Sequence, residues 1–155
     1  MNISIIATGK LKEKYLSEAQ EYFLGSCRRK NLNTTVFELP DLSMSDSPSE
    51  AESLRIKRAE GDQVLKILGK NDLIKKSYIV LLDLQGSKCS TEDFKAIVKN
   101  AEKRNRDSLT FIIGGSLGNS EEIKKTAHLL IRMSDMTYPH QLFRIALLET
   151  IDRLL

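Results

Sequence analysis

The chain has 155 residues, of which 41% are hydrophobic and 29% are charged, and its formal net charge is +3. These values are typical of a soluble globular protein and exclude a disordered or fibrous chain. No apolar stretch approaches the roughly 20 residues of a membrane-spanning helix, and the first predicted strand begins at once, without the basic flank of a signal peptide. We therefore expect one cytoplasmic domain over residues 1–155.

Cysteine and histidine are too few for a disulfide framework or a multi-histidine metal site. The chain has two cysteines, Cys27 and Cys89, without a CxxC pair, and two histidines, His128 and His140. Structural zinc takes four such ligands close together. We expect no metal and no catalytic thiol.

The first half of the chain is predicted to hold two strands and two helices. A strand at 2–7 leads to a helix over about 13–30, and a second strand follows at 34–39. The serine-rich segment 42–48 predicts a mobile loop. A helix is then expected over 48–68, with its proline in the first turn.

The second half continues the alternation of apolar strands with helices. The predicted elements are a strand at 78–82, a helix capped by Ser90, a strand at 109–113, a helix capped by Ser120, a strand at 128–133 and a last helix from about Gln141. Near-continuous apolar strands that alternate with helices predict an α/β fold, with a mainly parallel sheet and helices on both faces.

Two predicted strands end in irregular segments of small and polar residues. The sequence Gly-Gly-Ser-Leu-Gly at 114–118 follows one strand, and Met-Thr-Tyr-Pro-His-Gln at 136–141 follows another. In open α/β sheets, ligands bind at the carboxyl ends of the strands. These segments therefore predict a binding site, for which three interpretations are compared.

A dinucleotide site is disfavoured, because the first strand is followed by Gly9 alone and not by G-x-G-x-x-G. A serine hydrolase is the second interpretation. Gly114-x-Ser116-x-Gly118 matches the nucleophile elbow, and Asp135 and His140 follow in the hydrolase order. Against it, the acid and the base lie only five residues apart on one loop.

The third interpretation is a pocket for a flat nucleoside. Gly114 and Gly115 lack side chains, so backbone amides there can approach a ligand closely. Leu82, Leu117 and Met136 would supply apolar faces for an adenine. Such a pocket suits a cofactor that carries its own leaving group, since the protein then mainly positions it.

Four segments of the chain carry a family resemblance. They are I-S-I-I-A-T-G-K-L-K-E-K at 3–14, L-D-L-Q-G at 82–86, F-I-I-G-G-S-L-G at 111–118 and S-D-M-T-Y-P-H-Q at 134–141. Together they resemble the RlmH family of bacterial ribosomal RNA methyltransferases, within the SPOUT superfamily. The segments occur in this order over nearly the whole chain, and their combination is more specific than any one of them.

The resemblance implies an α/β fold with a C-terminal trefoil knot, and a homodimer that binds S-adenosylmethionine in the knot at the subunit interface. The implied reaction is methylation of N3 of a pseudouridine in 23S ribosomal RNA, on the assembled ribosome. Carried over by position, the cofactor site comprises Leu82, Gly114 with its neighbour Gly115, Met133, Ser134, Asp135, Met136, Thr137 and Tyr138.

For this implied reaction, His140 is a candidate base for the N3 proton, and Arg144, one helical turn later, is a candidate for steering RNA. Two alternatives stay open: His140 caps the last helix or bonds the cofactor loop, and Arg144 forms a salt bridge at the dimer interface. Lys10, Lys12 and Lys14 follow the first strand and are candidates for phosphate contacts.

Members of the family usually continue past the last helix with a tail resembling Y-R-A-x-x-I-x-x-G-x-x-Y-H. This chain ends at Leu155, and Asp152 stands in the place of the first tyrosine. The alternative to an active enzyme is therefore a non-catalytic, ribosome-binding relative that keeps the cofactor pocket.

Overall fold

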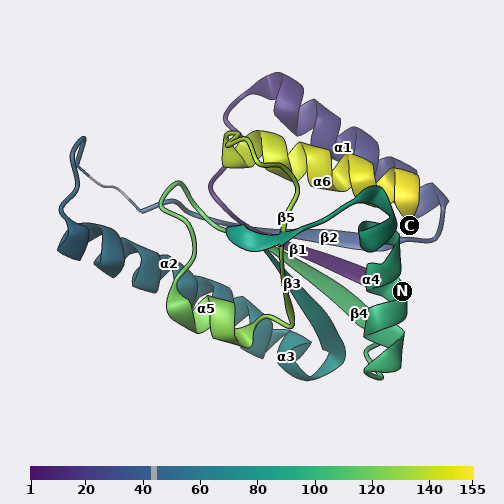
Figure 1. The fold of residues 1–155 in the computed structure, drawn as a ribbon. Helices are drawn as coiled ribbons and strands as arrows, with labels where there is room; N and C mark the ends of the chain where they lie inside the picture. The colour runs from purple at the N-terminus through teal and green to yellow at the C-terminus, as the bar shows by residue number, and fades with distance from the viewer. Residues whose placement is uncertain (43–44) are drawn as a thin grey trace.

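A five-stranded sheet forms the centre of the protein (Figure 1). The computed structural model describes residues 1–42 and 45–155, so part of the predicted loop at 42–48 lies outside the described residues. The sheet order is β2-β1-β4-β3-β5, and every neighbouring pair is parallel, which confirms the predicted α/β class. The strands are β1 (Asn2–Thr8), β2 (Asn33–Leu39), β3 (Ser77–Lys88), β4 (Ser108–Ile113) and β5 (Leu129–Arg132).

Strand β3 continues past Leu82, where the sequence prediction ended it. Leu82 pairs with Ile131, and after a shift of register Ser87 pairs with the same residue. At Gly86, between these two pairs, a Cβ atom would lie 2.6–2.7 Å from backbone atoms of Leu130 and Ile131. Only glycine allows two backbones to lie so close, and this contact holds the extension of β3 against β5.

Six helices are found in the described residues, one more than predicted. The extra helix, α3, has only four residues, too few to show a helical period in the sequence. The helices are α1 (Lys14–Arg29), α2 (Glu50–Lys70), α3 (Leu73–Lys76), α4 (Thr91–Lys103), α5 (Glu121–Thr126) and α6 (His140–Leu154).

The predicted caps at Ser90 and Ser120 are confirmed, since each hydroxyl accepts a hydrogen bond from the backbone N–H three residues later. The predicted start of α2 is wrong. Ser49 is its N-cap and accepts a hydrogen bond from Glu52 N, so Pro48 lies before the helix and not in its first turn.

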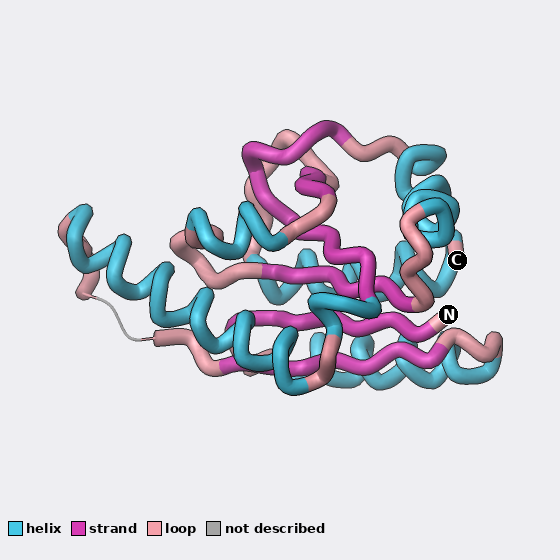
Figure 2. The backbone as a smooth tube through the Cα atoms, turned by 90° about the horizontal axis from the view of Figure 1, so that it is seen from below, coloured by secondary structure: helices cyan, strands magenta, loops and turns pink. Residues whose placement is uncertain are grey.

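Each face of the sheet has its own hydrophobic core, because alternate strand side chains point to opposite faces. On one face, Ile5 and Phe111 pack in a cluster with residues of α1, α4 and α6. On the other, Ile6 and Ile112 pack with residues of α2, α3 and α5. Figure 1 shows α1 and α6 on the opposite side of the sheet from α2 and α5, and Figure 2 shows the strands side by side between the helices. None of the described helices is long and apolar enough to cross a membrane.

A buried arginine ties the last helix to the sheet. Arg144 of α6 is 1% exposed, and its Nη1 donates to Glu38 Oε2 of β2 at 2.6 Å. Its Nη2 donates to the carbonyl oxygen of Gly9, just after β1. The guanidinium therefore fixes α6 against the carboxyl ends of β1 and β2.

Removal of the partner carboxylate should destabilise the fold. We expect Glu38→Ala to lower the free energy of unfolding by about 3 kcal/mol, because it leaves the buried Arg144 charge without a counter-charge. Glu149→Ala is the matched control, since Glu149 pairs with Arg153 on the surface, and it should cost less than about 1 kcal/mol. Urea unfolding measures both; equal losses would contradict this role for the buried pair.

Candidate functional site

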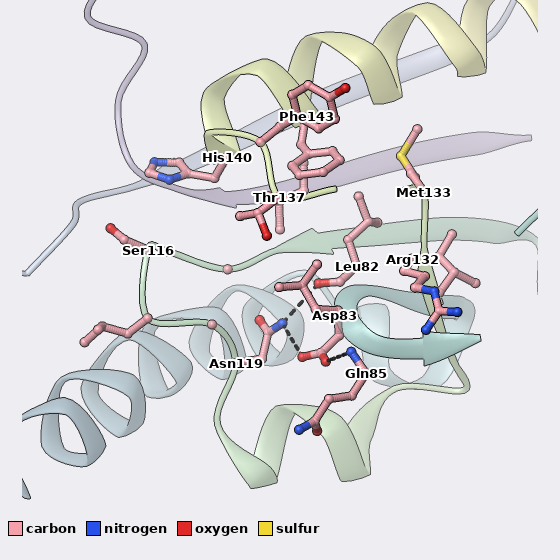
Figure 3. Close-up of a pocket in the computed structure, with 18 of the residues that line it drawn as sticks. Leu82, Asp83, Gln85, Ser116, Asn119, Arg132, Met133, Thr137, His140 and Phe143 are labelled. Carbon is pink, nitrogen blue, oxygen red and sulfur yellow. Dashed lines mark hydrogen bonds between the residues drawn. The ribbon is translucent and has the colours of Figure 1, made fainter. Parts of the chain in front are cut away.

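A cavity of about 610 Å³ lies at the carboxyl ends of β3, β4 and β5 (Figure 3). Small-molecule sites commonly have this size. The lining comes from residues 82–85 of β3, where its pairing with β4 ends, and from the loop after β4 at 113–119. The end of β5 and its loop, at 131–134 and 137–140, and the residues Lys57, Lys124 and Phe143 complete it. The predicted meeting of the two irregular segments at one sheet edge is confirmed.

The loop after β4 is held in place by an asparagine. Asn119 Nδ2 donates to the carbonyl oxygen of Leu82 at 3.1 Å and to Asp83 Oδ2 at 3.0 Å, as the dashed lines in Figure 3 mark. The loop itself is a tight turn in which Gly118 N donates to Gly115 O at 3.0 Å, and Gly118 has φ +88°, a conformation that favours glycine. The turn is thus locked to the end of β3.

The two adjacent glycines face the protein itself. A Cβ atom on Gly114 would collide with Asn119 Oδ1, and one on Gly115 would lie 2.9 Å from Glu60 Oε1. The sequence interpretation, in which the missing side chains leave space for a ligand, is therefore incomplete. The space where a Cβ atom of either glycine would lie is occupied by Asn119 and by Glu60. Gly114 and Gly115 still line the cavity.

Most of the predicted cofactor residues converge on the cavity. Asp135 and Met136 do not line it. Asp135 Oδ1 pairs with Arg132 Nε at 2.9 Å, and Met136 is 64% exposed, outside the lining of the cavity. The predicted residues that line the cavity are Leu82, Gly114, Gly115, Met133, Ser134, Thr137 and Tyr138.

Several lining residues were missed by the sequence analysis. Asp83 and Gln85 follow Leu82 directly, and the extension of β3 brings them to the cavity. Asn119 lies immediately before a correctly predicted helix cap. Phe143, on the first turn of α6, was not singled out, although it faces the cavity beside Thr137 in Figure 3.

His140 lines the cavity as the first residue of α6. Its Nε2 lies 3.8 Å from Asp41 Oδ2 and is enclosed without a hydrogen bond to any described group. A Cβ atom on Gly9 would lie 2.6 Å from this Nε2 and 2.8 Å from the same carboxylate oxygen. The His140 imidazole and the Asp41 carboxylate therefore both pack against the backbone of Gly9, in space that a side chain there would fill.

Glu60 supplies a second carboxylate close to that of Asp41. Glu60 of α2 is 7% exposed, and its Oε2 accepts a hydrogen bond from Leu42 N at 3.3 Å. A Cβ atom on Gly115 would lie 3.2 Å from Asp41 Oδ1 and 2.9 Å from Glu60 Oε1. Both carboxylates therefore approach the same position on the backbone. Burial raises the pKa of Glu60, and the negative charge of Asp41 raises it further.

The predicted role of Arg144 at the site is not supported by its position. Its guanidinium is buried and bonded to Glu38 and to the Gly9 carbonyl of the same chain, so it is not exposed for contact with RNA or with a second chain. Lys10, Lys12 and Lys14 are exposed at the carboxyl end of β1, and Lys14 forms only a 3.7 Å surface pair with Glu18.

The serine-hydrolase arrangement does not assemble. Ser116 lines the same cavity as His140, but Asp135 pairs with Arg132 and Lys88 instead of the histidine. The described residues show no hydrogen bond between Ser116 and an imidazole. A triad needs the acid to orient the base and the base to contact the nucleophile.

The raised pKa of Glu60 should make the free energy of unfolding depend on pH. Because the folded-state pKa is raised above the ordinary value of 4.5, the folded protein binds this proton more tightly, and the free energy of unfolding falls as pH rises through the folded-state pKa. We expect Glu60→Gln to unfold at a higher urea concentration than the native chain at about pH 8, and this gain to shrink toward about pH 5. Asp62→Asn, an exposed change on the same helix, should show no such trend. A gain for Glu60→Gln that is independent of pH would contradict the assignment.

Comparison with known proteins agrees with this architecture. The family model described as "Predicted SPOUT methyltransferase" matches residues 1–155. The protein named ribosomal RNA large subunit methyltransferase H from Clostridium kluyveri is 46% identical over 154 residues, which cover 99% of this chain and 92% of the relative. Similar proteins of Clostridium botulinum, named alike, and Clostridium perfringens, named ribosomal RNA large subunit methyltransferase H 1, are 44% and 41% identical over the same shares. The chain therefore belongs to the SPOUT methyltransferases and, among them, to the RlmH family.

Proposed function

We propose that this protein transfers a methyl group from S-adenosylmethionine to N3 of a pseudouridine in 23S ribosomal RNA, on the assembled ribosome and in the cytoplasm. The observation that carries the proposal is the cavity where β3, β4 and β5 end, with a histidine at its edge, in a chain 46% identical to a ribosomal RNA methyltransferase. The chain spans 92% of that relative's length.

The cavity fits the proposed cofactor in size and chemistry. Leu82, Leu117 and Phe143 give it apolar walls, and the loop backbones at 113–119 and 131–134 offer peptide groups for the edge of a base. A nucleoside needs such a combination of flat apolar contact and a few polar groups. We assign cofactor binding to Leu82, Gly114, Gly115, Met133, Ser134, Thr137 and Tyr138, with Asp135 and Met136 on the neighbouring surface.

S-adenosylmethionine, when bound, supplies a methyl group on a positively charged sulfur. The residues of this chain position the two reactants and handle the proton. The N3 nitrogen of a pseudouridine carries a weakly acidic proton that must leave, and we assign His140 as the group that accepts it. Phe143 and Tyr138 help to exclude water from this edge of the cavity.

RNA binding is assigned to Lys10, Lys12 and Lys14. They are exposed and follow β1, whose carboxyl end lies at the same sheet edge as the cavity. Ammonium groups at this edge suit the phosphates that flank a base inserted into the site.

We further propose that the enzyme is a homodimer and that its C-terminal part forms a trefoil knot. Large apolar side chains around the cavity, among them Met136, Tyr138 and Leu142, are exposed, as expected of a surface that a second copy covers. The close backbone contact of Gly86 with β5 is where a threaded chain would cross the extension of β3.

The direct test of the proposed activity uses ribosomes from a bacterial strain that lacks this modification. We expect transfer of radiolabelled methyl from S-adenosylmethionine to 23S RNA, at a pseudouridine and on its N3. Cofactor binding with no transfer to these ribosomes would contradict the proposed activity and favour a ribosome-binding relative without turnover.

The apolar wall of the cavity should contribute to cofactor affinity. We expect Leu117→Ala to weaken S-adenosylmethionine binding about 10-fold in calorimetry, because truncation removes roughly 1–2 kcal/mol of apolar contact. Leu54→Ala removes an exposed leucine of α2 outside the cavity and should leave the dissociation constant unchanged. Equal affinities for the two variants would argue against a nucleoside beside Leu117.

The lysines after β1 should set the salt dependence of ribosome binding. We expect Lys12→Ala/Lys14→Ala to weaken binding at low salt and to reduce the slope of log affinity against log salt by about 1.5, as the loss of two phosphate contacts predicts. The control, Lys75→Ala/Lys103→Ala, removes the same charge just before β3 and β4, at the opposite sheet edge. If both double variants reduce the slope equally, net charge and not a phosphate site explains the effect.

A further inference from the structure

The two nitrogens of His140 differ in their surroundings. Nε2 is enclosed at the Asp41 carboxylate, 3.8 Å from Oδ2, while the residue as a whole lines the cavity. A nitrogen that faces a carboxylate is favoured as the N–H position, which leaves the other nitrogen of a neutral imidazole free to accept a proton. A carboxylate on one side of the ring therefore favours one tautomer of the neutral imidazole over the other.

Asp41 presents one oxygen to each of two glycines at different strand ends. Oδ2 faces Gly9 after β1, together with His140, and Oδ1 faces Gly115 after β4, together with Glu60. A side chain on either glycine would occupy the space that the acidic groups use, since the ideal Cβ positions lie 2.6–3.2 Å from these atoms. The Asp41 carboxylate can therefore approach the backbone at Gly9 and at Gly115 because neither residue has a side chain.

We propose that Asp41 is a positioning residue for His140, which holds the imidazole with its proton on Nε2 and stabilises the imidazolium that forms during methyl transfer. The inference rests on the proposed function, in which His140 takes the N3 proton. In that step the N3–H bond breaks and the proton goes to His140 Nδ1. The N3 electron pair forms the new bond to the methyl carbon, and the pair of the broken carbon–sulfur bond stays on sulfur.

Glu60 is the more deeply buried of the two carboxylates in this cluster. Two neighbouring carboxylates do not ionise equally well, and the buried one retains its proton to higher pH. The pKa of Glu60 is raised by burial and by Asp41, whereas Asp41 is partly exposed to solvent. Burial thus favours the neutral form of Glu60, and Asp41 is the carboxylate whose Oδ2 lies beside His140 Nε2.

Two cations of the described residues lie near this cluster, Arg144 of α6 and Lys57 of α2, and Lys57 lines a small pocket together with Glu60. Arg144, one turn after His140 on α6, is bonded to Glu38 and to the Gly9 carbonyl. Lys57 of α2 lines the same cavity and is the cation that faces the site from that helix. Asp41 is the carboxylate that reaches the His140 imidazole from the loop after β2.

Nitrogen-15 NMR of the protein alone tests the contact, because only two histidines give signals. His128 is an internal reference: its Nδ1 accepts a hydrogen bond from Ile79 N at 3.0 Å, which fixes its proton on Nε2. We expect neutral His140 to be in the Nε2–H form in the native chain and in Glu60→Gln, and to become a mixture of both forms in Asp41→Asn. Asp62→Asn, exposed on α2, is the control and should match the native chain. The same tautomer in Asp41→Asn as in Asp62→Asn would overturn the proposal.

The rate of methyl transfer to ribosomes tests the consequence. We expect Asp41→Asn to lower kcat at least about 10-fold with little change in cofactor affinity, and Asp62→Asn to leave both unchanged. A matching loss of cofactor affinity in Asp41→Asn would indicate a merely structural role and overturn the proposal. A native chain without transfer would instead contradict the proposed function, and the NMR result, which needs neither cofactor nor RNA, would then decide the inference alone.

Discussion

The site depends on the parallel pairing of three strands. Because β3 lies between β4 and β5 and all three run in the same direction, residues 82–85 of β3 lie beside the carboxyl ends of β4 and β5. Segments 82–85, 113–119, 131–134 and 137–140 therefore enclose one cavity although they are far apart in sequence. Parallel strands need long connections, and here the helices α4 and α5 make them, covering opposite faces of the sheet. The fold thus creates the cavity as a direct result of its topology.

Three glycines near the cavity leave space that a side chain would otherwise fill. Gly86 lets the extension of β3 lie against β5, while Gly9 and Gly115 leave room for the carboxylates of Asp41 and Glu60. Buried acidic groups destabilise a fold, and functional sites are where such a cost is commonly tolerated. The cluster beside His140 therefore fits a site selected for chemistry more than for stability.

The sequence predicted the strands and the location of the site because those depend on local pattern. Apolar runs ending in small or polar residues are visible without a structure, and most of the residues that the family resemblance implied for the cofactor line the cavity. It could not predict contacts between distant segments: Arg144 was expected at the RNA but is buried against Glu38, and Asp135, expected to line the cavity, pairs with Arg132. Asp41 and Glu60 carry no motif, and only the fold brings them to His140.

The most direct measurement is the mapping of cofactor binding onto the backbone by NMR. On titration with S-adenosylhomocysteine, we expect saturable shifts of amide signals concentrated in 82–85, 113–119, 131–134 and 137–140, the segments that line the cavity. No saturable shift, or shifts concentrated at the other edge of the sheet around 103–108, would contradict the claim that these strand ends form one nucleoside site.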